Sequence, residues 1–391
     1  MKKVYLLFYL SGIASVLPAQ VNTDSLWGVW NDPQKADTIR LKAVQDIAWE
    51  MLYSNPDSGY ALARKGLDFA RAKGQKRWQA RMLNTIGSAF NVKGDYVAAL
   101  EHYQKGLAAM KEAGDRKGTA ALSNNIGLLY RNMGDNAKAF QYYRDDLAIQ
   151  EELKNKNGIA NAYNNIGTLY SDEANHSKAL EYYQKSMRQM EELGDKTGMA
   201  TAYVNVGAIY SQQGDYTTAL DYYRKSLAIR EEQDDQLGIA TLYNNIRVVY
   251  KQLGQYPQAL EYYRKGRLIQ EKLGDKKGLV NSYYFTGTTF LDRESYTDAA
   301  KWCSKGLALS REMRALRSER NNCNCLYKAY KALGQNNRAL AFHEQYVALN
   351  DSLQKDETNE RLEQMELSRQ VMADSLGKEE EKLKMEITHQ N

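Results

Sequence analysis

The sequence lacks the signatures of catalysis. It contains no glycine-rich phosphate loop, no HExxH motif, no GxSxG motif and no paired carboxylates in a setting that would raise a pKa. Its four histidines are scattered along the chain. We therefore expect a protein that is not an enzyme and that binds no cofactor.

Proline and an excess of charge of one sign are also missing. Only four prolines interrupt 391 residues, of which 43% are hydrophobic, so the chain can bury a large core. The 53 basic and 48 acidic residues leave a net charge of +5 and alternate around the predicted helices without forming a basic stripe. The composition therefore gives no support to nucleic acid as a partner.

Cysteine is limited to Cys303, Cys323 and Cys325 near the end of the chain. Their spacing, together with that of His343, matches no standard zinc motif, so we expect no metal site. Small buried thiols are the preferred interpretation. The alternative is a disulfide between Cys303 and Cys323, which export of the chain would permit.

Long apolar runs are absent except at the start of the chain. The segment MKKVYLLFYLSGIASVLPAQ has two basic residues, an apolar stretch from Val4 to Leu17 and the small residue Ala19, which is the layout of a secretory signal peptide. The stretch is shorter than the roughly 20 residues that a membrane span needs. We therefore predict a signal peptide over residues 1–19, export to the periplasm or the exterior, and no membrane span in the mature chain.

The chain repeats itself with a period of 40 residues. That shift aligns an aromatic column, two glycine columns and an alanine column; in the first glycine column, Ala174 and Glu294 replace two of the glycines. The alanine column consists of Ala99, Ala139, Ala179, Ala219, Ala259, Ala299 and Ala339. Four columns at one spacing indicate an array of equivalent units.

Each unit has the pattern of two amphipathic helices. Apolar residues recur every three or four positions in two segments, and a pair such as Gly134-Asp135 separates these segments in most copies. Glycine can end one helix in the left-handed conformation, and aspartate can cap the next helix. The sequence therefore predicts an all-α fold of stacked helix pairs.

These columns resemble those of tetratricopeptide repeat proteins. The resemblance is carried by residues such as Ile126, Gly127 and Tyr130 in the first helix and Ala139 and Tyr143 in the second, and it covers roughly residues 38–350. The period is longer than the family's usual ~34 residues and is most similar to that of the long-repeat branch with the spindle-orientation scaffolds. The resemblance implies a right-handed superhelical solenoid of about eight helix pairs, with a concave groove lined by the first helices.

Some positions depart from this pattern. Arg247 occupies a slot that holds glycine in most other copies, and we expect it to widen the helix packing locally. Asp146 and Tyr346 replace small residues of the second helix, and Tyr284-Phe285 stand where other copies have asparagines.

Asparagine is concentrated on one face of the first helices. At 100° per residue, Asn161, Asn164 and Asn165 lie roughly opposite the apolar face, on the side that lines the groove in the family. The polar residues at corresponding positions are Arg81, Asn84, Asn124, Asn125, Arg131, Asn161, Asn164, Asn165, Asn205, Asn244, Asn245, Lys251, Asn281 and Asn321. We call the asparagines of this set the asparagine ladder.

The ladder predicts a partner-binding site. A carboxamide both donates and accepts hydrogen bonds, so a row of them can satisfy the N–H and C=O groups of an extended peptide. This role is favoured for the column that holds Asn84, Asn124, Asn164, Asn244 and Asn324. The next column, with Asn125, Asn165, Asn205 and Asn245, is open between partner binding and a bond to the backbone of the adjacent helix. Arg81 and Arg131 could contact a ligand carboxylate, although a solvated arginine is the simpler interpretation of either alone.

Tyrosine pairs, such as Tyr142-Tyr143 and Tyr182-Tyr183, recur in the second helices. We expect the second tyrosine of each pair to pack in the core, with its hydroxyl reaching a polar edge. A tyrosine binding stripe is the alternative.

The ends of the chain differ from the array. After an N-terminal segment, residues 20–37, the first helix pair is diverged, with Asn55 placed to cap its second helix and Pro56 in the first turn. The solenoid should cover residues 38–350. Residues 351–391 are highly charged and free of proline, which favours a long exposed helix or a weak coiled coil over a frayed tail.

We therefore predict a non-catalytic scaffold that binds an extended peptide or partner segment in its groove. The chain is also similar in layout to the input region of bacterial repeat-bearing sensors. The alternative is thus a ligand-sensing module whose C-terminal helix forms a homodimer and transmits the signal, and dimerisation through residues 354–391 would favour it. A structural spacer is a third hypothesis, and it predicts a groove without selectivity.

Overall fold

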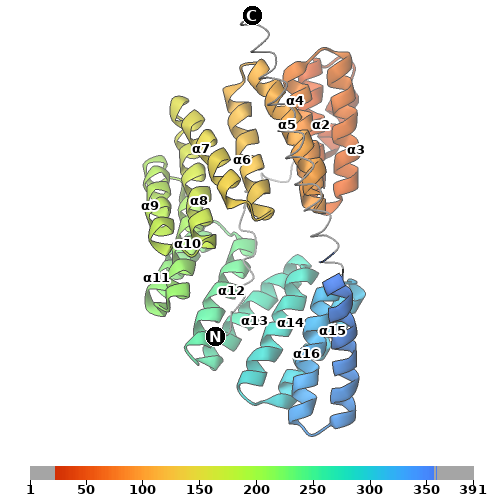
Figure 1. Cartoon of the computed structure of the whole chain (residues 1–391), viewed down its shortest axis with the longest axis vertical. Coiled ribbons are helices and arrows are strands. Elements are labelled where there is room, and N and C mark those ends of the chain that lie inside the picture. The colour runs from red at the N-terminus through yellow and green to blue at the C-terminus, as the bar shows by residue number, and fades with distance from the viewer. Residues whose placement is uncertain (1–22, 356–357, 359–391) are drawn as a thin grey trace, which may run out of the picture. The chain divides into compact units, whose positions relative to one another are not determined.

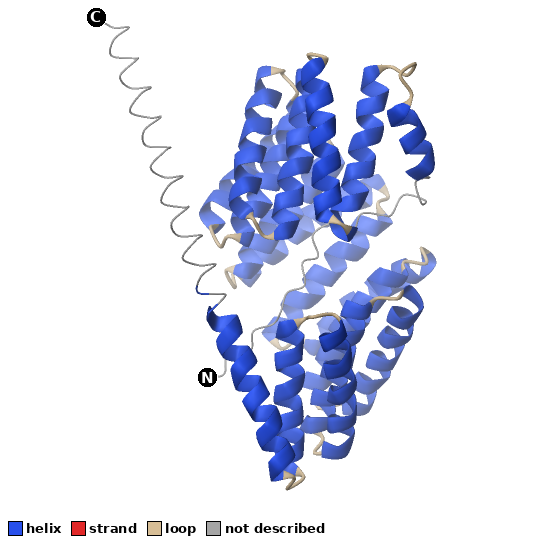
Figure 2. Cartoon of the chain, turned by 90° about the vertical axis from the view of Figure 1, so that its right-hand side faces the viewer, coloured by secondary structure: helices blue, strands red, loops and turns tan. Residues whose placement is uncertain are grey.

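The fold consists of α-helices joined by short connections. The computed structural model describes residues 23–355 and Thr358, and no strand occurs within them (Figures 1 and 2). The helices are α1 (Thr23–Asn31), α2 (Asp37–Ser54), α3 (Pro56–Ala72), α4 (Lys76–Lys93), α5 (Tyr96–Glu112), α6 (Arg116–Asn132), α7 (Asn136–Glu152), α8 (Lys156–Asp172), α9 (His176–Leu193), α10 (Lys196–Gln213), α11 (Tyr216–Glu232), α12 (Gln236–Gln252), α13 (Tyr256–Leu273), α14 (Lys276–Asp292), α15 (Tyr296–Glu312) and α16 (Leu316–Ala332). A last described helix, residues 336–355, follows α16.

Consecutive helices pack as pairs. The pairs include α2 with α3, α4 with α5, α6 with α7, α8 with α9, α12 with α13 and α14 with α15. We call the first helix of each pair, from α2 and α4 to α16, an A helix and the second a B helix. The predicted all-α solenoid of helix pairs is confirmed.

The chain divides into two compact units. Unit 1 extends to Ile209 and unit 2 begins at Tyr210, so that the division falls within α10. Each unit is a run of the same helix pairs. We describe the two units separately below.

Glycine and its following residue end one helix and begin the next, as the pattern predicts. Gly134 has φ of 80°, and the carboxylate of Asp135 accepts a hydrogen bond of 3.0 Å from the backbone N–H of Lys138. Ala174 and Glu294, which replace glycine, also adopt the left-handed conformation, at φ of 57° and 61°. The neighbouring helices therefore impose this turn even where a side chain makes it unfavourable.

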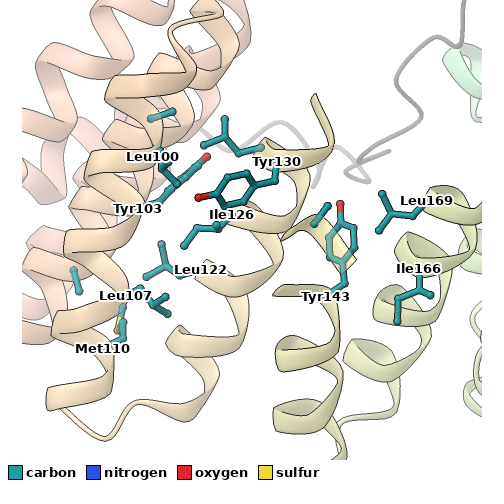
Figure 3. Close-up of a cluster of buried hydrophobic side chains, with 14 residues drawn as sticks. Leu100, Tyr103, Leu107, Met110, Leu122, Ile126, Tyr130, Tyr143, Ile166 and Leu169 are labelled. Carbon is teal, nitrogen blue, oxygen red and sulfur yellow. The ribbon is translucent and has the colours of Figure 1, made fainter. Parts of the chain in front are cut away.

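The second tyrosine of each pair is buried, as expected. The rings of Tyr143 and Tyr183 are 1% and 2% exposed, and Figure 3 shows Tyr143 in the core cluster with Ile126 and Ile166. A Cβ atom at Gly127 would lie 2.7 Å from the Tyr143 ring, so glycine is required where this ring meets the A helix. The first tyrosine packs as well, as where Tyr142 stacks on Tyr130 with ring centroids 5.6 Å apart.

The preferred prediction of buried thiols holds only for Cys323, and the alternative disulfide between Cys303 and Cys323 names the wrong partner for Cys303. Cys303 of α15 forms a disulfide with Cys325 of α16, with Cα atoms 6.2 Å apart, and Cys323 is the buried free thiol. Residues 323 and 325 point to different sides of α16 because two helical positions differ by about 200°. Cys325, not Cys323, is therefore on the side that faces Cys303.

Two further sequence predictions lie largely beyond the residues that the structure describes. The signal peptide over residues 1–19 falls outside them, and so does most of the charged segment 351–391. Within the described part, no helix combines the length and apolar character that crossing a membrane requires.

Candidate binding face on the A helices

The asparagines of unit 1 form hydrogen-bonded pairs between neighbouring A helices. In each pair, the Nδ2 group of one asparagine donates to the Oδ1 atom of an asparagine 41 residues earlier. The helices involved are α4, α6, α8 and α10 (Figure 1). The bonds join Asn125 to Asn84 (2.8 Å), Asn165 to Asn124 (2.7 Å) and Asn205 to Asn164 (2.9 Å). The two columns of the ladder therefore act together in unit 1.

This arrangement changes the interpretation of the second column. Asn125, Asn165 and Asn205 bond to the neighbouring side chains, whereas the structural alternative had proposed a bond to backbone. All six asparagines of the pairs are half-buried and reach the surface of the A helices. The pairing holds each carboxamide in one orientation and uses only part of its hydrogen-bonding capacity.

Among the described residues, each pair leaves complementary groups open. The bond uses the carbonyl oxygen of the earlier asparagine and one N–H of the later asparagine. The NH2 group of the earlier asparagine and the carbonyl oxygen of the later one therefore stay available to a ligand. A peptide backbone presents one C=O and one N–H per residue. Each pair can therefore bind both kinds of backbone group without reorienting.

Two ion pairs use the same spacing of 41 residues. Arg131 Nε lies 2.6 Å from Asp172 Oδ2 in unit 1, and Lys251 Nζ lies 2.7 Å from Asp292 Oδ2 in unit 2. Arg131 and Lys251 thus have protein carboxylates as partners, and a ligand carboxylate would have to compete with these. The sequence patterns did not identify Asp292 as the partner of Lys251. The two residues are nevertheless 41 positions apart, as are the paired asparagines.

The Arg131 pair is partly buried. The side chains of Arg131 and Asp172 are 19% and 25% exposed. Burial of the guanidinium opposes its charged form, but the hydrogen bond and the charge of Asp172 outweigh it and raise the pKa of Arg131. The pair joins α6 to α8.

The remaining predicted residues of unit 1 lie near the pairs but outside them. Arg81 places its guanidinium over the ring of Trp78, with Cζ 4.9 Å from the centroid. Asn161 is exposed at the start of the asparagine face of α8. The structure therefore groups six of the predicted site residues into pairs and places these two beside them.

Within its described residues, unit 2 does not continue the pairs. Asn244 Oδ1 accepts a hydrogen bond of 3.0 Å from Arg247 Nε, and Phe285 stands at the position 41 residues after Asn244, where pairing would need an asparagine. Asn245 is half-buried on the same face, and Asn321 accepts hydrogen bonds from Arg320. The faces of the two units therefore differ in chemistry.

Comparison with known proteins identifies the repeats. A model of the tetratricopeptide repeat matches residues 78–152 and 158–232, which contain all three asparagine pairs. These residues are tetratricopeptide repeats. The paired asparagines are thus part of the repeats themselves. Comparison with curated proteins finds no match.

Several solved structures share the repeat fold. The quorum sensor NprR from B. thuringiensis, in its apo form, is 16% identical, with a TM-score of 0.58 over 83% of this chain and 91% of that chain. The Rap conjugation gene regulator of plasmid pLS20, solved with the Phr* peptide, is 16% identical, with a TM-score of 0.53 over 85% and 96%. A signal-transduction ATPase with a tetratricopeptide repeat sensor, from Pyrococcus horikoshii, is 13% identical, with a TM-score of 0.62 over 86% and 53%. At these identities the likeness shows a shared fold. In the Rap regulator, a protein with this fold binds the Phr* peptide.

Proposed function

We propose that this tetratricopeptide repeat protein is a non-catalytic scaffold that binds an extended peptide, or an extended segment of a partner protein, along the A helices of unit 1. The observation that carries the proposal is the row of three asparagine pairs between α4, α6, α8 and α10. Each pair keeps a donor and an acceptor for the backbone of the ligand.

The pairing lowers the cost of binding. Asparagine side chains that are free to rotate lose entropy when a ligand fixes them, whereas these are already held by their partners. Their half-buried setting also strengthens a hydrogen bond relative to one in open water. Recognition of backbone groups gives affinity for an extended chain, and the side chains between the pairs would supply selectivity.

The comparisons support the same class of function. The matched family model describes a repeat and no catalytic family, and the Rap regulator was solved with a peptide. Export also belongs to the proposal. It is supported by the signal-peptide pattern of residues 1–19 and by the Cys303–Cys325 disulfide, since disulfides persist mainly in oxidising compartments.

Peptide selection tests the proposal. The full mature chain, residues 20–391, is incubated with a synthetic pool of random 12-residue peptides, and bound peptides are recovered and sequenced by mass spectrometry. We expect enrichment with the parent protein. Replacing Asn84, Asn124 and Asn164 with alanine should weaken binding of the recovered peptides at least about 100-fold, because three or more hydrogen bonds of about 1 kcal/mol each are lost.

A matched control removes carboxamides elsewhere. Gln104 and Gln184 are exposed on the B helices α5 and α9, and their replacement with alanine should leave peptide binding unchanged. Circular dichroism and thermal melting establish that both variants are folded. Equal peptide binding by the parent and the triple asparagine variant would refute the role of the pairs.

A sensing module remains the second candidate function. The observation that favours it is the likeness to the fold of a quorum sensor and of a repeat-bearing sensor. In that case the peptide would act as a signal, and the charged C-terminal segment would transmit it through a homodimer. The light-scattering mass of the full chain, with and without a recovered peptide, separates the two, because only the sensor requires a dimer.

A further inference from the structure

The asparagine pairs of unit 1 form a regular row. Each bond runs in the same direction, from the Nδ2 group on the later helix to the Oδ1 atom on the earlier one, at 2.8, 2.7 and 2.9 Å. Every pair therefore presents its available NH2 group and carbonyl oxygen in the same order along the row. A ligand that uses all three pairs must offer the same two backbone groups three times, at the spacing of the pairs.

The spacing of the pairs is the distance between neighbouring A helices. One side-chain hydrogen bond links each helix to the next, so α4, α6, α8 and α10 are direct neighbours on this face. Helices in direct contact have axes about 8–10 Å apart. The ligand must therefore present equivalent backbone groups, on one side of its chain, once in every interval of about 8–10 Å.

A β-strand does not meet this requirement. It rises about 3.3 Å per residue, so three residues span about 10 Å, but successive residues face opposite sides. Groups three residues apart in a strand thus point in opposite directions, and groups two residues apart are only about 6.6 Å from each other. An α-helical ligand is excluded as well, because its own turns use the backbone N–H and C=O groups.

A polyproline II helix meets the requirement. It has three residues per turn and rises about 3.1 Å per residue, so that every third residue returns to the same side after about 9 Å. It has no internal hydrogen bonds, which leaves its backbone groups to a partner. The half-buried carboxamides are held in one orientation by their bonds to each other, and a ligand with a preformed backbone loses little entropy on binding to them.

We propose that the ligand of unit 1 is a segment in the polyproline II conformation, of which every third residue is bound by one asparagine pair. This inference rests on the proposed function and specifies the class of peptide. The N–H of each bound residue donates to the carbonyl oxygen of Asn125, Asn165 or Asn205, so these ligand positions exclude proline, which has no N–H. The two ligand residues between them favour proline, because its φ of about −65° suits this conformation.

A proline scan of the ligand tests the period of three. A peptide that the parent protein enriches from the random pool is synthesised with proline at each position in turn, and its affinity is measured by fluorescence anisotropy. We expect binding to weaken about 5- to 10-fold at positions three residues apart, where one hydrogen bond is lost, and to be unchanged or tighter at the positions between. Losses at every second position, or at all positions alike, would overturn the inference.

A variant of the protein connects this period to the pairs. Asn165→Ala removes the acceptor of the middle pair, so proline at the middle sensitive position of the ligand should weaken binding to this variant no further. Gln184→Ala removes an exposed carboxamide of α9 and should leave all the proline effects as they are in the parent. Thermal melting establishes that both variants are folded. Equal proline effects in the parent and in Asn165→Ala would overturn the contact between the pair and the ligand N–H.

The outcomes distinguish this inference from the proposed function. Peptides that bind and lose affinity in the triple asparagine variant, but whose sensitivity to proline has no period of three, would overturn the polyproline II conformation alone. Failure of the parent to enrich any peptide would overturn both.

Discussion

Replacing Asp146 with serine is expected to stabilise the folded protein at pH 7.5 by about 3 kcal/mol and to have little effect near pH 4. Asp146 lies in α7 at a slot that holds a small residue in other repeats, and it is 3% exposed. Burial raises the pKa of its carboxyl group to about 6, although a hydrogen bond from Gln150 acts in the opposite direction. Each pKa unit corresponds to about 1.4 kcal/mol.

The direction of the pH effect follows from linkage. The folded state holds the proton of Asp146 more tightly than the unfolded state, in which the pKa is near 3.8. Stability from this group is therefore greatest below pH 3.8 and falls as the pH rises through 6. Serine does not ionise, and Ser186 in the equivalent slot donates to the backbone carbonyl of Ala160 at 2.7 Å. The advantage of serine should thus appear between pH 4 and 7.

Urea unfolding of the parent and Asp146→Ser at several pH values measures this difference. Asp145 is the matched control, because it is the adjacent aspartate of α7 and is exposed, so Asp145→Ser should change stability by less than about 0.5 kcal/mol at every pH. A difference between Asp146→Ser and the parent that does not depend on pH would show that burial does not perturb this carboxyl group.

Reduction of the Cys303–Cys325 disulfide is expected to destabilise unit 2 by about 3 kcal/mol. The disulfide joins α15 to α16 and closes a loop with a sequence separation of 22 residues. Opening a loop of this length increases the chain entropy of the unfolded state by about this amount. Hydrogen exchange of α15 and α16, with and without a reducing agent, measures the loss locally.

Cysteine variants separate the two possible pairings. Cys323 is buried, which raises the pKa of its thiol to about 11, so it stays protonated and does not exchange with the disulfide. The reducing agent should therefore still destabilise Cys323→Ala, whereas it should have no effect on a variant with both Cys303 and Cys325 replaced by alanine. If the reducing agent left the stability of Cys323→Ala unchanged, the pairing of Cys303 with Cys323 would be favoured instead.

The helices could be predicted because their signals are local. Asn55 caps α3 by accepting a hydrogen bond of 3.1 Å from Ser58, with Pro56 in the first turn, and both features were evident in the sequence. The 40-residue columns likewise predicted which tyrosines are buried. Caps and amphipathic spacing depend on residues within one or two turns, so they can be recognised without the fold.

The pairing of side chains could not be predicted from the same columns. Contacts between A helices join residues 41 apart, one more than the repeat period, because neighbouring helices are staggered. The surroundings of the Arg247 side chain could not be predicted for a related reason. The sequence showed a large residue in a glycine slot, but only the structure shows that Phe285 and Tyr263 enclose its charge.

Photocrosslinking would show directly which face of unit 1 holds the ligand. A benzophenone amino acid is placed at Asn161, which is exposed on the asparagine face of α8, or at Gln184, which is exposed on the B helix α9. Each protein is illuminated with the random peptide pool. Binding along the asparagine pairs predicts crosslinked peptides from position 161 and few from position 184, with the yield at 161 lost in the triple asparagine variant. Crosslinks mainly from position 184, or a yield at 161 that the triple variant retains, would contradict it.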